Sequence, residues 1–185
     1  MADFNARIAP FIDITFYLTS VFGVQETRIH KGLDIATATS AGYVPMYSMC
    51  NGIVIRNSWD DGYGNYIIIK DNENGIAFLF AHMNDPSPLQ VGESVVIGQY
   101  IGDEGTSGNS TGIHLHLEMQ DLSNRDWIFG GDLENYINPA EWMGFPNIQG
   151  ISIIYDGIPI VETKKKKKFP WAIYTNLIRK KRRNI

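Results

Sequence analysis

Short runs of β-branched and aromatic residues recur through the middle of the chain, with polar, glycine-containing stretches between them. The clearest runs are residues 53–55, 66–69 and 76–80, and the stretches 57–65 and 71–75 separate them. Runs of this length bounded by turn residues are typical of strands joined by tight connections. Because no helical periodicity competes in this region, the pattern predicts an all-β fold built on an antiparallel β-sheet.

The second half of the sequence adds weaker signals. Residues 91–102 alternate apolar residues with glycines, and the polar, glycine-rich residues 105–112 lead directly into His114. That position beside a histidine favours a shaped binding loop, and the lack of a lysine argues against a phosphate cradle. A short helical turn is expected over residues 138–142, which have proline in second place, and a strand pair over residues 151–160.

Chain length and cysteine content limit the kinds of site that are available. The 185 residues suffice for one domain with a substantial core. Cys50 is the single cysteine, so an internal disulfide and a cysteine metal cluster are both excluded, and we expect a buried, apolar thiol. A metal site in this chain must therefore be built from histidines and carboxylates.

Charge divides the sequence at about residue 162. Residues 1–162 carry all 20 acidic residues and six basic ones, a balance of −14, whereas residues 163–185 carry ten basic residues and no acid. Apolar residues follow Pro170 at helical spacing: Trp171, Tyr174, Leu177 and Ile178. We expect the segment from Lys164 to Arg183 to contact an anionic envelope polymer, an anionic lipid or the acidic body; no specific nucleic-acid partner is indicated.

The N-terminal region lacks both common membrane-directed patterns. A signal peptide begins with basic residues, which are absent here, and Pro10, Asp13 and Thr15 interrupt the apolar stretch of residues 8–24. We therefore expect no signal peptide and no transmembrane span.

All four histidines stand in short patterns that suit metal or acid–base chemistry. His30 lies four residues before Asp34, His114 lies two before His116, and His82 ends an apolar run. Each pattern alone is common by chance, because a single histidine is more often a satisfied core or surface residue. The occurrence of all four in such patterns favours a metal site.

The spacing of His114 and His116 has a direct structural consequence. Alternate side chains of a strand share a face, so both imidazoles should point into one site while Leu115 and Leu117 face the core. Neighbouring imidazoles disfavour each other's protonation, and a bound cation uses the neutral rings. Catalytic zinc takes three nitrogen or oxygen ligands and a water, whose pKa it lowers toward neutrality.

The chain carries an ordered set of short motifs: LTSVFG at 18–23, HKGLDIA at 30–36, NGIV at 51–54, GNYI at 64–67, FAHM at 80–83, GTSG at 105–108, STGIHLHLE at 110–118 and NP at 138–139. This set resembles the motifs of the LytM/lysostaphin-type zinc endopeptidases, which act on peptidoglycan. The resemblance spans about residues 16–143. It implies a lysostaphin-like antiparallel β fold, a duplicated hybrid motif, with a groove that holds the zinc site.

By position, the resemblance implies that His30, Asp34 and His116 bind one zinc ion (Zn2+) per chain and that His82 and His114 are catalytic. One of these two imidazoles would accept a proton from water, and the other would steady the tetrahedral oxyanion. The implied substrate is the peptide part of bacterial peptidoglycan, a cross-bridge or a stem peptide. Three positions depart from the family pattern without touching an implied ligand: Phe80, Ile113 and Leu117.

Two other functions share some of these features. Residues 91–102 also resemble half of a lipoyl or biotinyl carrier domain, but a carrier needs an exposed lysine, and none occurs between Lys70 and Lys164. A catalytically silent peptidoglycan-binding module or phage tail component with the same fold is the second alternative. The missing export signal, the small size and the compact catalytic domain favour a phage- or prophage-encoded enzyme that acts at the cell wall, carried in a virion or released at lysis.

The predicted organisation has four parts. A lead-in covers residues 1–15, the zinc endopeptidase domain residues 16–145, an extra strand or linker residues 146–162, and a basic tail residues 163–185. The loops over residues 57–65 and 121–132 are expected to decide which peptide bond is cut.

Overall fold

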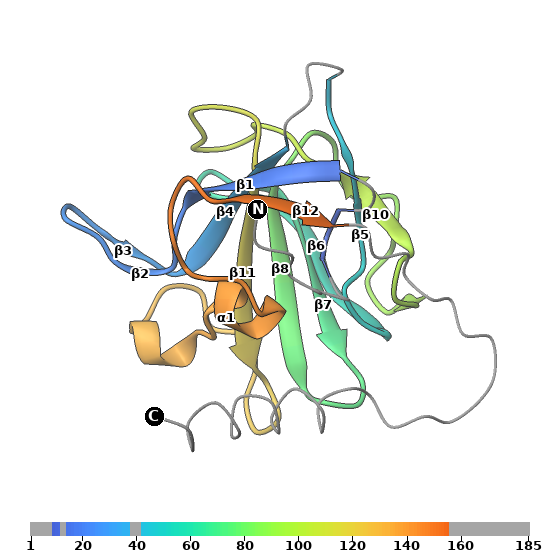
Figure 1. The fold of residues 1–185 in the computed structure, drawn as a ribbon. Helices are drawn as coiled ribbons and strands as arrows, with labels where there is room; N and C mark the ends of the chain where they lie inside the picture. Colours follow the sequence, from blue (N-terminus) through green and yellow to red (C-terminus); the bar gives the residue numbers. More distant parts are fainter. Residues whose placement is uncertain (1–8, 12–13, 38–41, 156–185) are drawn as a thin grey trace.

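The computed structural model describes residues 9–11, 14–37 and 42–155 and is organised around one eight-stranded sheet (Figure 1). Every pairing between neighbouring described strands is antiparallel, which confirms the predicted class. In spatial order the strands are β12 (Ser152–Tyr155), β1 (Ile14–Ser20), β4 (Gly32–Thr37), β11 (Leu115–Asp121), β8 (Ile76–Met83), β7 (Gly64–Asp71), β6 (Gly52–Asp60) and β9 (Ser94–Val95).

Smaller elements surround this sheet. β2 (Gly23–Val24) and β3 (Ile29–His30) form a hairpin that projects from the body (Figure 1), and β5 (Pro45–Tyr47) pairs with β10 (Tyr100–Asp103). A 3₁₀ turn, η1 (Leu133–Asn135), precedes the short helix α1 (Pro139–Met143). Within the described residues, neither helix has the length or apolarity to cross a membrane.

The central strands are covered on both faces, which is why their apolar runs are continuous. All eight residues of β8 are buried. Phe78 and Phe80 belong to the larger hydrophobic cluster, whereas Leu79 and Ala81 belong to a smaller cluster on the other face. This alternation follows from the two-residue period of a strand. His82 is the second-to-last residue of this doubly packed strand.

The hairpin of β6 and β7 is longer than the sequence pattern predicts. Residues 57–60 were expected to be part of a turn, but they continue β6 and pair with residues 64–67 of β7. Their polar composition reflects position, because this end of β6 lies at the surface and Trp59 is 55% exposed. Only residues 61–63 remain as the turn.

The predicted helical turn is confirmed as α1. The Asn138 side chain accepts hydrogen bonds from the backbone of Ala140 and Glu141, Pro139 takes the first helical position, and Gly144 ends the helix in the left-handed region with φ 84°. The first half of the predicted strand pair is confirmed as β12, which pairs with β1. Its second half, together with the basic tail and its predicted helix, lies outside the described residues.

Candidate metal centre

The sheet order brings the two ligand motifs together. β4 and β11 are neighbours, and Asp34 is the direct register partner of His116. His30 is buried and ends β3, and only Lys31 separates it from the start of β4. Residues separated by more than 80 positions in the sequence therefore meet at one edge of these strands because of a single strand pairing.

Three ligand-type atoms converge on one point. Asp34 Oδ1 lies 2.7 Å from His116 Nδ1 and 3.1 Å from His30 Nε2, and the two nitrogens lie 3.2 Å apart. Three ligands around a tetrahedral zinc ion with bonds of about 2.0 Å are roughly 3.3 Å apart. The triangle thus has nearly the dimensions of one face of a zinc coordination tetrahedron, and these three residues can hold a metal ion.

Gly32 makes the close approach of the two motifs possible. It pairs with Glu118 across β4 and β11, and a Cβ atom at this position would lie 2.6 Å from His116 Cε1 and 2.7 Å from the Leu117 carbonyl oxygen. Any larger residue would displace the His116 ring or the strand. The glycine between His30 and Asp34 is therefore required by packing of the His116 ring.

Each histidine of the site has one ring nitrogen fixed by an acceptor outside the site. The Nδ1–H groups of His30, His82 and His114 donate to the carbonyl oxygens of Val21 (2.9 Å), Ser107 (2.8 Å) and Gly112 (2.8 Å). His116 is turned the other way, because its Nε2 donates to Glu118 Oε1 at 3.1 Å. Such outer partners fix ring orientation and tautomer, so three rings present Nε2 to the site and His116 presents Nδ1.

In the ligand group, the Asp34 carboxylate interacts with the imidazoles of both His30 and His116. Burial raises the pKa of Asp34, but hydrogen bonds with His116 and His30 outweigh burial and hold the pKa well below its usual range. Burial lowers the pKa of His116, but hydrogen bonds with Asp34 and Glu118 reverse this and raise it to about 9. Arg28 adds a cation 3.7 Å from Asp34 Oδ2.

His82 and His114 form a second pair beside the ligand group. Their ring centroids are 4.7 Å apart, and His114 Nε2 lies 3.7 Å from Asp34 Oδ1. Burial lowers the pKa of His82 to about 4, against its hydrogen bond to Ser107 and with help from the neighbouring His114. His82 also has φ 60°, a left-handed conformation that is uncommon for residues other than glycine. Backbone conformations of this kind cluster at active sites, and a neutral imidazole is able to accept a proton.

The glycine-rich loop predicted to be a binding loop positions this pair. Gly105 pairs with His114 in an isolated antiparallel bridge, and the Ser107 carbonyl oxygen accepts a hydrogen bond from His82 Nδ1–H. Gly108, with φ 73°, lets the loop touch the β6–β7 turn, because a Cβ there would lie 2.2 Å from the Gly64 nitrogen. The loop thus acts on both histidines through its backbone.

All five residues implied by the resemblance meet in this one region, and the side chains of Arg28, Glu118 and Tyr63 lie beside them. Arg28 faces Asp34, Glu118 accepts from His116, and Tyr63 donates its hydroxyl to Glu118 Oε1 at 3.0 Å. Glu118 shares the alternation of His114 and His116, so strand periodicity alone places it on the same face. No sequence pattern indicates the position of Tyr63.

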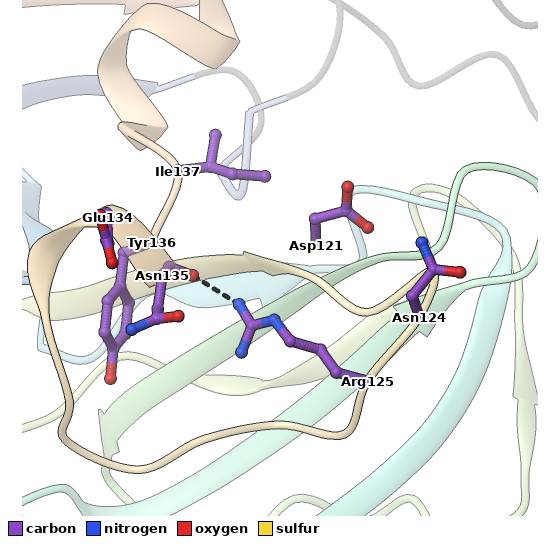
Figure 2. Close-up of a pocket in the computed structure, with 7 residues that line it drawn as sticks. All are labelled: Asp121, Asn124, Arg125, Glu134, Asn135, Tyr136 and Ile137. Atoms are coloured by element: carbon purple, nitrogen blue, oxygen red, sulfur yellow. Dashed lines mark hydrogen bonds between the residues drawn. The ribbon is translucent and has the colours of Figure 1, made fainter.

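A separate pocket of about 290 Å3 lies farther along β11 (Figure 2). The Arg125 side chain crosses it and donates to the Asn135 carbonyl oxygen at 2.7 Å and to Gln120 Oε1 at 3.0 Å. Asp121 and Glu134 also line it, and none of the four histidines does. Because the Arg125 guanidinium is bound to two protein partners, it ties residues 122–136 to β11.

The fold and the site together define an antiparallel β domain with a His–Asp–His group beside a second histidine pair. The family model "Peptidase family M23" matches residues 28–128, a segment that contains all five site residues. The chain belongs to peptidase family M23.

Individual relatives agree with this family. The chain is 35% identical over 93 residues to the DD-carboxypeptidase/endopeptidase Mpg of Neisseria meningitidis, a match that covers 50% of this chain and 20% of that protein. It is 30% identical over 94 residues to the peptidoglycan DD-endopeptidase ShyC of Vibrio cholerae, covering 51% and 21%. The chain thus spans about a fifth of the length of these curated relatives.

A solved structure confirms the fold. The catalytic domain of lysostaphin from Staphylococcus simulans superposes with a TM-score of 0.54 at 21% identity, covering 70% of this chain and 90% of that domain. The predicted lysostaphin-like fold class is therefore correct.

Proposed function

We propose that the chain is a zinc-dependent endopeptidase that hydrolyses peptide bonds in bacterial peptidoglycan. The observation that carries the proposal is the convergence of His30 Nε2, Asp34 Oδ1 and His116 Nδ1 within 3.2 Å of one another. One carboxylate and two imidazoles are the ligand types of catalytic zinc, and three protein ligands leave a fourth position open. We assign one zinc ion per chain to this group.

Zinc held there would supply Lewis acidity, which lowers the pKa of water and polarises a scissile carbonyl. His82 and His114 do the remaining acid–base work in this proposal. With Nδ1 tied to a backbone carbonyl, each ring keeps Nε2 for the reaction, and His114 Nε2 lies 3.7 Å from Asp34 Oδ1. One Nε2 accepts the proton of the attacking water, and the other, when protonated, donates a hydrogen bond to the oxyanion.

The substrate class comes from the family and from the charge of the site. The chain belongs to peptidase family M23, and its relative ShyC is named as a peptidoglycan DD-endopeptidase. Arg28, half exposed beside Asp34, is a cation to which a carboxylate of a stem peptide can bind. The proposed place of action is the bacterial cell wall; the phage or prophage origin and the four-part organisation stay predictions.

The test is digestion of purified cell walls combined with metal analysis. The protein should bind about one zinc ion and release soluble peptides from the walls, a chelator should stop the release, and added zinc should restore it. Mass spectrometry of the products, using walls with direct and with glycine cross-links, identifies the bond. Zinc binding without peptide release from either wall would support the silent wall-binding module instead, and an absence of zinc binding would overturn the proposal.

A further inference from the structure

The carboxylate that orients His116 has a second donor. Glu118 is 2% exposed, and its Oε1 accepts from His116 Nε2 at 3.1 Å and from the Tyr63 hydroxyl at 3.0 Å. Its Oε2 has no hydrogen-bond partner among the described residues. The position of this buried carboxylate therefore depends on two contacts, one of which is a ligand-type histidine.

Tyr63 lies in the β6–β7 turn and contacts both halves of the site. Its hydroxyl holds Glu118, and its backbone carbonyl accepts the His82 amide at 2.8 Å. One residue thus connects to the ligand group through Glu118 and to the acid–base pair through His82. The turn belongs to the loop that the sequence associates with substrate choice.

The Tyr63 ring is held by aromatic neighbours from two other segments. Its centroid lies 5.8 Å from that of Tyr66 on β7 and 6.0 Å from that of Phe129, in the loop after β11. Arg56 lies on β6, the strand next to β7, and its guanidinium is 5.0 Å from the centroid of the Phe129 ring. Such ring and cation–ring contacts restrict the tilt of Tyr63 and therefore the direction of its hydroxyl.

We propose that Tyr63 is a positioning residue of the metal site, an inference that rests on the proposed zinc function. Its hydroxyl fixes the Glu118 carboxylate against His116 Nε2, so that Nε2 keeps its proton and Nδ1 is the ring nitrogen that faces His30 and Asp34 and is left to bind the metal. Without the hydroxyl, Glu118 can rotate within its buried site, and the orientation of the His116 ring is less firmly fixed. A direct partner of a ligand, as Glu118 is of His116, is typically worth about 10- to 100-fold in metal affinity or activity, and Tyr63 should contribute toward the lower end of that range through Glu118.

The experiment measures zinc affinity by competition with a chromophoric chelator. Tyr63→Phe should weaken zinc binding by about 10-fold or more. The matched control is Tyr66→Phe, which removes the same atom from a neighbouring ring of the same cluster and should leave the affinity within about 2-fold of the wild-type value. Cobalt substitution supplies a second readout: the visible absorption bands of the Co2+ form should shift in Tyr63→Phe and not in Tyr66→Phe.

A double-mutant cycle distinguishes positioning from a general structural effect. Because Tyr63 acts through Glu118, the variant Tyr63→Phe/Glu118→Gln should bind zinc no more weakly than Glu118→Gln alone. The inference would be overturned if the losses of zinc affinity in Tyr63→Phe and Glu118→Gln added up in the double variant. It would also be overturned if Tyr63→Phe bound zinc as tightly as the wild type. A lowered melting temperature of metal-free Tyr63→Phe with wild-type affinity would overturn it as well. A wild-type protein that binds no zinc would overturn the proposed function and this inference with it.

Discussion

Asp34 and His116 face each other as register partners on β4 and β11, and Asp34 Oδ1 lies 2.7 Å from His116 Nδ1. The pairing joins a motif near the start of the domain to one near its end. It also places His30 Nε2 3.1 Å from the same carboxylate oxygen. Asp34 is thus the common partner of both imidazoles, and the only anion among the three ligand-type groups.

Removal of that anion should abolish metal binding. Asp34→Ala leaves two neutral imidazoles, which bind zinc far more weakly than a three-ligand set with a carboxylate. Zinc content per chain, measured by elemental analysis after dialysis, should fall from about one to a small fraction. Asp61→Ala, which removes an exposed carboxylate in the β6–β7 turn, should keep its zinc. Stoichiometric zinc in Asp34→Ala would show that the ligand assignment is wrong.

Alanine substitutions of the two histidines in the His-x-His pair should have different effects on zinc content in the same assay. His116→Ala removes Nδ1 from the triangle and should lose zinc. His114→Ala removes a ring that lies 3.7 Å from Asp34, and it should keep zinc while turnover falls by about 10²–10⁴-fold. Equal zinc loss in the two variants would contradict the division between ligand and catalytic residue.

The left-handed conformation of His82 decides which substitution tests its role. Asparagine tolerates φ 60°, whereas alanine pays about 1 kcal/mol there. Both His82→Asn and His82→Ala should keep zinc and lose about 10²–10⁴-fold in turnover. His82→Asn should retain the wild-type free energy of unfolding more closely, as measured by denaturant titration. Wild-type turnover in His82→Asn would remove His82 from the proposed mechanism.

The central strands could be predicted, and the five residues that meet at the candidate site could be named, because each leaves a local signal. Apolar runs mark β7 and β8, and two-residue periodicity places His114, His116 and Glu118 on one face. The hairpin end at residues 57–60 could not be predicted from its polar residues, because its strand conformation depends on hydrogen bonds to β7 and not on burial. The local sequence pattern therefore identifies strands whose side chains are buried in the core. It misses exposed strand segments that are held only by hydrogen bonds to a neighbouring strand.

The contacts around the ligands depend on tertiary structure and leave no comparable signal. Tyr63 approaches Glu118 only because β7, β8 and β11 are consecutive in the sheet and the β6–β7 turn lies over that end. The need for glycine at position 32 likewise becomes clear only from the tertiary structure, in which the His116 ring lies where a Cβ atom of residue 32 would be. Sheet order, which brings distant residues together, is the missing information in both cases.

The basic segment should govern attachment to whole cell walls and not the chemistry. Residues 163–185 carry ten positive charges and no acid, opposite to the balance of the preceding part. Truncation after Glu162 should leave cleavage of a small soluble peptide unchanged and weaken wall binding. Because charge attraction is screened over about 8 Å at physiological salt, added salt should weaken wall binding of the full chain in the same way. A full-length variant with Lys164 to Lys168 replaced by glutamine controls for chain length.

Two outcomes would contradict this view of the basic segment. If the truncated protein binds walls as tightly as the full chain at low salt, the segment is no tether. If cleavage of the soluble peptide rises on truncation, the segment instead covers the acidic body.

A buried carboxyl away from the ligands should make stability fall as pH rises. Glu104 is 1% exposed, accepts a hydrogen bond from the Thr37 hydroxyl through Oε1, and has no partner for Oε2 among the described residues. Burial raises the pKa of Glu104 to about 7, against the hydrogen bonds from the Thr37 hydroxyl and the Thr37 backbone. The unfolded chain has the ordinary value near 4.5. The folded state therefore binds the proton more tightly, and its advantage is complete below pH 4.5 and lost as pH rises through 7.

Glu104→Gln isolates this effect. The free energy of unfolding of the wild type minus that of Glu104→Gln should decrease between pH 5 and pH 7, with a slope of at most about 1.4 kcal/mol per pH unit, and level off above pH 8. Denaturant titrations in the presence of a chelator keep metal binding out of the difference, and the histidines, common to both proteins, cancel. Glu73→Gln, at an exposed carboxylate, should show no such slope. A parallel pH dependence in the wild type and Glu104→Gln would mean that Glu104 is ionised in the folded protein throughout this range.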